Sequence, residues 1–165
     1  DARWAELEAS CAALGLEAPV GLGLPDGGVR ADDVAERIGP LIEGADRVVT
    51  LGRDGVYGHR DHLAVTEAVL AVAGEVHLAV FPRGLFHPLW RGLRRAGFAG
   101  VATGMHPQSF GVLRPDLRVA VDPVWREVSA ACHRTQLRGA PVDFLLPGLL
   151  TTLGSEDWFD VRPAP

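Results

Sequence analysis

The stretch "RVVTLGRDGVYGHRDHLAVTEAVLAVAG", residues 47–74, places three local patterns in direct succession. Its first part, "RVVTLG" (47–52), is β-branched and ends in glycine, which is typical of a buried strand. Its last part, about 61–73, is an apolar helical pattern. A glycine-rich polar loop lies between them. Because ligands of open α/β sheets bind where strands end and loops lead into helices, this order predicts a site in the loop.

Two histidines and a carboxylate occupy the end of this loop. His59 and His62 are three residues apart, a spacing that puts two side chains on one face of a helix and that can aim both into one cleft from a loop. Asp61 could hold one imidazole in a chosen tautomer. The spacing alone favours the alternative, a solvated pair with Asp61 as a helix cap. The glycines and the position at a strand end favour a site, and both interpretations stay open.

Strand and helix patterns alternate along the rest of the chain. We predict helices over 2–14, 32–43, 87–98 and 123–136, and strands over 19–24, 76–81 and 117–122. Asp32 or Asp33 is the expected cap of the second helix. The remaining tail is apolar and broken by prolines. The alternation predicts a single α/β domain over residues 1–165 with a mostly parallel sheet.

Composition narrows the class of protein. An apolar fraction of 47% with 22% charged residues indicates a folded globule. The net charge of −5 disfavours nucleic acid as a partner. The sequence shows no apolar run long enough for a membrane span and no signal peptide. We expect Cys11 and Cys132 to be reduced core thiols of a cytoplasmic protein. The sequence has arginine but no lysine, which is typical of GC-rich bacterial coding.

The histidine loop also resembles a known motif. "DGVYGHRDHLAVTEAVLA" is similar to the second motif of the LmbE/PIG-L family of zinc-dependent N-acetylglucosaminyl deacetylases, which usually reads Gly-His-Pro-Asp-His before an apolar helix. Three further segments agree in order and spacing, and with them the resemblance covers nearly the whole chain: "ARWAELEASCAALGL", "GLGLPDGGV" and "SAACHRTQ". The resemblance implies a Rossmann-like three-layer fold.

The resemblance implies roles for the loop residues. His62 would be a metal ligand for Zn²⁺. His59 would be the catalytic histidine that stabilises the oxyanion or protonates the leaving amine, and Asp61 would orient a histidine. Arg60 stands where the family has proline, which changes the stiffness of the loop but removes no ligand.

The substrate implied by the resemblance is a small N-acetylated sugar conjugate. Tyr57 matches a tyrosine that helps to polarise the acetyl carbonyl in some members, and Arg3 and Asp26 would face the sugar. The sequence does not give the oligomeric state, although the apolar segment 144–153 would suit an interface in a homo-oligomer.

One departure from the family pattern is serious. The first motif, Ala-His-Pro-Asp-Asp-Glu, follows the first strand of the family and supplies two metal ligands and the general base. The nearest string here is "MHPQS" (105–109), which has His106 but no carboxylates and lies after the second motif. The first strand is therefore expected to be missing. The sequence is then a fragment, or the N-terminal part belongs to another chain, or the metal site is lost.

Two hypotheses follow from this departure. The first is a zinc-dependent N-deacetylase of which this chain holds all but the first strand and motif. The second is a non-catalytic protein of the same fold with a vestigial site. Under either hypothesis we expect the 165-residue chain alone to be inactive and to bind zinc weakly or not at all. If it does bind zinc, the first further ligands to examine are Asp54, His87 and His106.

Overall fold

The computed structural model describes residues 2–95, 97, 111–137 and 142–163. By its contacts the chain divides into two compact units. One comprises residues 1–21, 85–104 and 120–156 and is called the helical unit here. The other comprises residues 22–84, 105–119 and 157–165 and is called the sheet unit. The assignment of residues 1–165 to a single domain stays a prediction.

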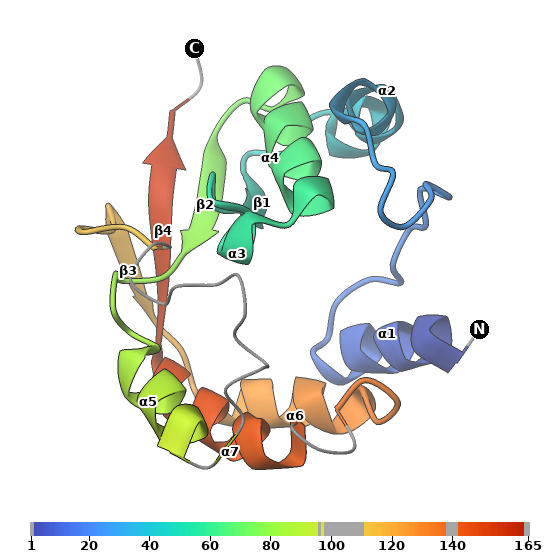
Figure 1. Ribbon diagram of the computed structural model, residues 1–165. Helices are drawn as coiled ribbons and strands as arrows, with labels where there is room; N and C mark the ends of the chain where they lie inside the picture. Colours follow the sequence, from blue (N-terminus) through green and yellow to red (C-terminus); the bar gives the residue numbers. More distant parts are fainter. Residues whose placement is uncertain (1, 96, 98–110, 138–141, 164–165) are drawn as a thin grey trace. The chain divides into compact units, whose positions relative to one another are not determined.

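The sheet unit is built on four strands in the order β1-β2-β4-β3 (Figure 1). They are β1 (Val48–Leu51), β2 (Val76–Val80), β3 (Leu117–Ala120) and β4 (Glu156–Arg162). β1 pairs with β2 in parallel, from Val48 opposite Val76 to Leu51 opposite Ala79. β4 pairs with β2 in the antiparallel direction. The fold is α/β as predicted, but the prediction of a mostly parallel sheet is wrong because the sheet is mixed.

The strand that changes the sheet is β4, which the sequence pattern did not reveal. Pairing with β2 puts Trp158 on one face of the sheet, opposite Val80, and puts Phe159 and Val161 on the other face, opposite Ala79 and His77. Apolar side chains of β4 therefore lie on both faces of the sheet, and acidic residues alternate with them irregularly along the sequence. Such a strand has no clean alternation of apolar and polar residues, so a search for period two overlooks it.

The core of the sheet unit lies around β2. Val76, Leu78 and Val80 are buried on one face of β2, and His77 is buried on the other. Helix α4 (Arg60–Val72) packs against β1 and β2, and α2 (Ala31–Ile42) packs against α4. The buried side chains that these helices contribute are Val34, Ala68 and Val69.

The helical unit consists of two packed helix pairs. Helix α1 (Ala2–Ala13) packs on α6 (Val124–Cys132), where Ser10 and Ser129 share a hydrogen bond of 2.9 Å. Helix α5 (His87–Arg95) packs on α7 (Val142–Leu153). Cys11 and Cys132 are free thiols, as expected from the sequence. Among the described residues no helix has the length and apolar character that crossing a membrane requires.

Two local predictions are wrong. Residues 19–24 form no strand, because the segment contains Gly23 at a φ of +63° and its Leu22 carbonyl accepts from the Arg37 guanidinium of α2. Asp32 and Asp33 do not cap α2. The N-cap is Arg30, which makes no side-chain cap hydrogen bond, and the two acids lie in the first turn, where they still complement the positive end of the helix dipole.

The packing of β2 gives a stability prediction. Leu78 is 0% exposed whereas Leu113, also in the sheet unit, is 77% exposed. Leu78→Ala should lower the free energy of unfolding by about 2–5 kcal/mol, because it removes buried methyl groups and leaves a cavity. Leu113→Ala, the matched control, should change it by less than about 0.5 kcal/mol. Urea denaturation measures both, and equal effects would contradict the described core.

Candidate functional site

The loop after β1 is held tightly against the end of β2. A Cβ at Gly52 would lie 3.0 Å from both the Ala79 carbonyl oxygen and Val80 Cγ1, so only glycine fits without a shift. The chain then forms a one-turn helix, α3 (Gly55–Gly58), which the sequence did not predict. Val56 has a φ of 69°, which is an unfavourable value for a β-branched residue. The loop therefore has a specific, strained shape at the carboxyl ends of β1 and β2.

The loop brings the two predicted histidines together. The ring centroids of His59 and His62 are 4.8 Å apart, with an angle of 38° between the ring planes. His59 is the N-cap of α4 and His62 lies in its first turn. Both rings are only partly exposed. The three-residue spacing thus produces the adjacency that the sequence suggested.

The backbone partners of the two rings imply opposite tautomers, with the proton on Nδ1 in one ring and on Nε2 in the other. His62 Nδ1 lies 3.0 Å from the Gly55 carbonyl oxygen, and since a carbonyl only accepts, Nδ1 carries the proton. His59 Nδ1 lies 3.3 Å from the Asp61 backbone N–H, and since that group only donates, Nδ1 is the acceptor. In its neutral form His59 therefore carries its proton on Nε2. This is the nitrogen that can donate to a bound group.

Asp61 connects the histidine loop to a distant turn. It is 7% exposed, and its two carboxylate oxygens accept from Gly27 N (2.6 Å) and Val29 N (3.3 Å). The turn also carries the exposed Asp26. The expectation that the Asp61 carboxylate orients a histidine stays a prediction, although its backbone amide does contact His59.

Asp54, which the sequence suggested only as a possible further metal ligand, makes two contacts that hold the loop. Its Oδ1 accepts from Val56 N at 3.0 Å, and its Oδ2 accepts from Gly111 N at 2.7 Å. The Asp-Gly pair at 54–55 is a turn signal that could have indicated the first contact. No local signal could have indicated the second, because Gly111 is 57 residues away. With both oxygens bonded to backbone amides, Asp54 is better placed to shape the loop than to bind a metal.

The other predicted site residues belong to the helical unit, or they or their side chains fall outside the described part of the structure. Tyr57 is in α3, but its side chain is outside the described part of the structure. Arg3 is exposed on α1 and His87 begins α5, and both belong to the helical unit. His106 lies outside the described residues.

The ligands needed for a metal ion are not complete in the described part of the chain. Within residues 2–95, 97, 111–137 and 142–163, no group of three His, Cys, Asp or Glu side chains could hold a metal. Zinc in a catalytic site takes three protein ligands. The described residues therefore do not by themselves form a zinc site, and the role of His62 as a ligand stays a prediction.

His77 serves the sheet rather than the histidine loop. It is buried on β2, and its Nε2 lies 2.8 Å from Glu75 Oε1, which also accepts from Arg47 at 2.9 Å. The hydrogen bonds from Arg47 and then from His77 lower the pKa of Glu75. Val48 N donates to the Glu75 carbonyl, so this cluster lies at the amino ends of β1 and β2, away from the loop.

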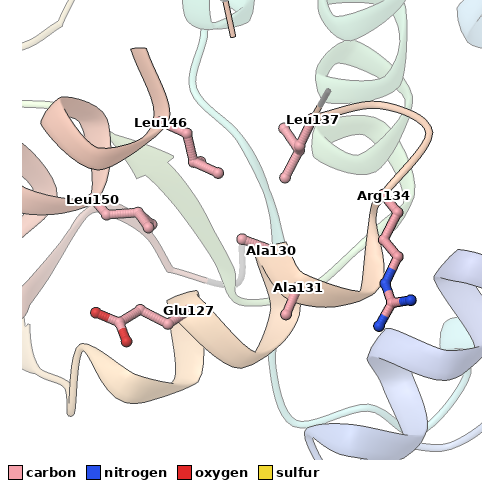
Figure 2. Close-up of a pocket in the computed structure, with 7 residues that line it drawn as sticks. All are labelled: Glu127, Ala130, Ala131, Arg134, Leu137, Leu146 and Leu150. Carbon is pink, nitrogen blue, oxygen red and sulfur yellow. The ribbon is translucent and has the colours of Figure 1, made fainter. Parts of the chain in front are cut away.

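The helical unit contains a groove between α6 and α7 (Figure 2), with a volume of about 290 Å³. Ala130, Leu146 and Leu150 project into it, and the charged groups of Glu127 and Arg134 lie at its two ends. None of the predicted site residues lines this groove. Its walls are mainly apolar and offer no pair of metal-binding side chains, so it does not replace the histidine loop as the candidate site.

The contacts of Asp61 give a testable prediction. Asp61→Ala should speed hydrogen exchange at the Gly27 and Val29 amides, because both lose their acceptor. Bonds to a charged acceptor contribute about 1.5–3 kcal/mol each, so the exchange rates should rise at least tenfold. Asp26→Ala, a neighbouring exposed carboxylate, is the control and should leave both rates unchanged. Unchanged exchange in Asp61→Ala would exclude these two bonds.

Comparison with known proteins supports the resemblance of the histidine motif. No curated protein matches the chain closely enough to count as a relative. Residues 1–73 match the family PIG-L, described as GlcNAc-PI de-N-acetylase. This family consists of metal-dependent N-deacetylases that act on N-acetylated sugars. The matched residues 1–73 include His59, Asp61 and His62, so the predicted histidine motif lies within the part of the chain that is similar to the PIG-L family.

Proposed function

We propose that the protein takes part in zinc-dependent removal of the acetyl group from an N-acetylglucosamine-type conjugate. The observation that carries this proposal is a pair of adjacent imidazoles that are opposite tautomers. Their ring centroids are 4.8 Å apart, and they lie at the carboxyl ends of two parallel strands. One ring is arranged as a metal ligand and the other as a hydrogen-bond donor. Metal-assisted amide hydrolysis needs both of these functions at one place.

The orientation of His62 supports its role as a metal ligand. Metal-binding histidines almost always donate their second ring N–H to a carboxylate, a backbone carbonyl or a water, which fixes the tautomer. His62 Nδ1 makes such a contact with the Gly55 carbonyl oxygen at 3.0 Å. The nitrogen that would bind zinc is then Nε2.

The protonation of His59 supports a role beside the metal. With Nδ1 accepting from Asp61 N, the proton of the neutral ring is on Nε2. This N–H would donate to the oxygen that becomes negative as the amide is attacked, or would protonate the leaving amine. In the same proposal Tyr57 helps to polarise the acetyl carbonyl, Asp61 orients a histidine, and Asp26 and Arg3 contact the sugar.

The remaining ligands and the general base must come from outside the described residues. When bound in such a site, zinc lowers the pKa of a coordinated water to about 7 and so supplies the nucleophile. One histidine does not hold zinc tightly. The proposal therefore requires additional donors, of which carboxylates beside β1 are the kind that the family motif supplies.

A non-catalytic role is the alternative function. The observation in its favour is that the described residues contain no group of three metal-binding side chains. A protein of this kind would use the same loop for binding or would keep it as a vestige. The metal content of a form of the protein that carries the additional donors separates the two proposals, because only the deacetylase needs a bound ion.

The two histidines should respond differently to substitution in a form of the protein that binds zinc. His62→Ala should abolish tight zinc binding, because it removes a ligand. His59→Ala should keep zinc and slow amide hydrolysis by about 10²–10⁴-fold, the usual contribution of a positioned acid–base group. His77→Gln, at the other end of β2, is the control and should change neither. Elemental analysis and an assay of acetate release would show the split, and equal metal loss in the first two variants would mean that the roles are wrong.

Ligand count gives a prediction for the 165-residue chain by itself. It should bind zinc weakly or not at all and should not hydrolyse an N-acetylglucosamine conjugate, because a catalytic zinc takes three protein ligands and the described residues contain no group of three that could hold a metal. Equilibrium dialysis against zinc and an acetate-release assay test both statements. One zinc ion per chain together with hydrolysis would contradict this prediction and would direct attention to Asp54, His87 and His106.

A further inference from the structure

The contacts around Gly55 and Val56 assign a role to Asp54 that neither the family motif nor the proposed function gives it. We propose that Asp54 is a positioning residue that orients the His62 imidazole through the peptide group between Gly55 and Val56. The part of this inference that concerns metal binding rests on the proposed function. The geometry on which it stands is independent of any metal.

One peptide group carries both hydrogen bonds. Its N–H, on Val56, donates to Asp54 Oδ1 at 3.0 Å, and its carbonyl, on Gly55, accepts from His62 Nδ1 at 3.0 Å. A peptide group is planar, and its N–H and C=O point in opposite directions. A carboxylate that fixes the N–H therefore also fixes the direction of the carbonyl. The order of contacts is carboxylate, peptide, imidazole.

Asp54 is itself held at a fixed point of the sheet. Its second oxygen accepts from Gly111 N at 2.7 Å. The next residue, Val112, donates to the Phe81 carbonyl at 2.9 Å and accepts from Arg83 N at 2.8 Å, just beyond β2. Gly111 has a φ of +89°, and a Cβ there would lie 2.5 Å from the Phe81 oxygen, so only glycine allows this approach. Asp54 thus connects the histidine loop to the end of β2.

The strained backbone at Val56 is a second, separate observation. Its φ of 69° is unfavourable for a β-branched residue, and such conformations persist only where the surrounding contacts impose them. The Asp54 bond is made to the N–H of this residue. A peptide plane turned away from this orientation would relieve the strain, but it would also move the Gly55 carbonyl away from His62 Nδ1.

The chemical effect resembles that of a carboxylate bonded directly to a metal-binding histidine. A carboxylate on the N–H side polarises the peptide, and hydrogen bonds in such chains strengthen one another. The Gly55 oxygen becomes a better acceptor, so the His62 proton stays on Nδ1 and Nε2 keeps the lone pair that could bind a metal. Loss of a residue that orients a ligand in this way typically weakens metal binding about 10–100-fold.

The tautomer of His62 in the 165-residue chain tests the inference without a metal. ¹⁵N NMR at pH ~8.5, about two units above the ordinary histidine pKa, distinguishes protonated Nδ1 from protonated Nε2. Wild type should show Nδ1–H for His62, and Asp54→Ala should shift the ring to a mixture with Nε2–H. Asp54→Asn, whose amide oxygen can still accept from Val56 N, should retain Nδ1–H. A protein that merely lost stability would not change the tautomer of its folded molecules.

Asp122→Ala is the matched control. Asp122 Oδ1 also accepts from the amide two residues later, Val124 N, at 3.0 Å. This variant loses the same kind of local bond and should leave the His62 tautomer unchanged. A shift in Asp122→Ala equal to that in Asp54→Ala would overturn the inference.

Two further outcomes complete the test. If Asp54→Ala does not fold, Asp54→Asn decides: its His62 Hδ1 resonance should move upfield, because a neutral amide polarises the peptide less than a carboxylate, and an unchanged Hδ1 would overturn the inference. An unchanged tautomer in folded Asp54→Ala would also overturn it while leaving the proposed deacetylase function intact. Conversely, a tautomer shift in the 165-residue chain, together with no zinc binding in a form of the protein that carries the additional donors, would support the positioning role and refute the proposed function.

Discussion

The peptide group between Gly55 and Val56 fixes the geometry of the histidine loop. Its N–H is bound by Asp54 and its carbonyl is bound by His62, each at 3.0 Å. Because the group is planar, these two bonds restrain a single orientation. The second Asp54 oxygen extends the restraint to Gly111 and so to the end of β2. The position of the imidazole is thus set by backbone hydrogen bonds anchored in the sheet.

This arrangement has an energetic cost that the same contacts offset. A non-glycine residue held in the left-handed region costs about 1–3 kcal/mol, and Val56 is such a residue at a φ of 69°. A hydrogen bond to a charged acceptor contributes about 1.5–3 kcal/mol, and Asp54 supplies one to the Val56 amide. The two quantities are of the same order. The loop can therefore keep a strained shape without a large loss of stability.

The sheet determines where the histidine loop lies. β1 and β2 are parallel, so their carboxyl ends meet at one edge, and the histidine loop lies at that edge. The Arg47–Glu75–His77 cluster lies at the opposite, amino ends, where hydrogen bonds to Glu75 connect Arg47, which precedes β1, with His77 of β2. The sheet unit thus separates a structural histidine from a pair suited to chemistry. In the proposed function the adjacent histidines would supply a ligand and a hydrogen-bond donor, and a metal ion would require further ligands, because the described residues contain no group of three that could hold one.

Much of the architecture followed from the sequence because it depends on local patterns. The predictions of β1, β2, α1, α2 and α4 are confirmed to within a few residues, since burial on a strand or on a helix face leaves a periodic apolar signal. The His59–His62 adjacency also followed from a local spacing. The antiparallel β4 did not, because Trp158 and Phe159 point to opposite faces and give no clean period.

The sequence by itself determined which residues meet at the mouth of α4 and which family motif they resemble. Only the tertiary structure decided the tautomers of the two imidazoles and the contacts that Asp54 makes. The reason is that both depend on hydrogen bonds whose partners are backbone groups. Val29, Gly55 and Gly111 contribute an N–H or a C=O that every non-proline residue possesses, so their sequence positions carry no sign of the contact. The fold selects these groups by bringing them near Asp61, His62 and Asp54.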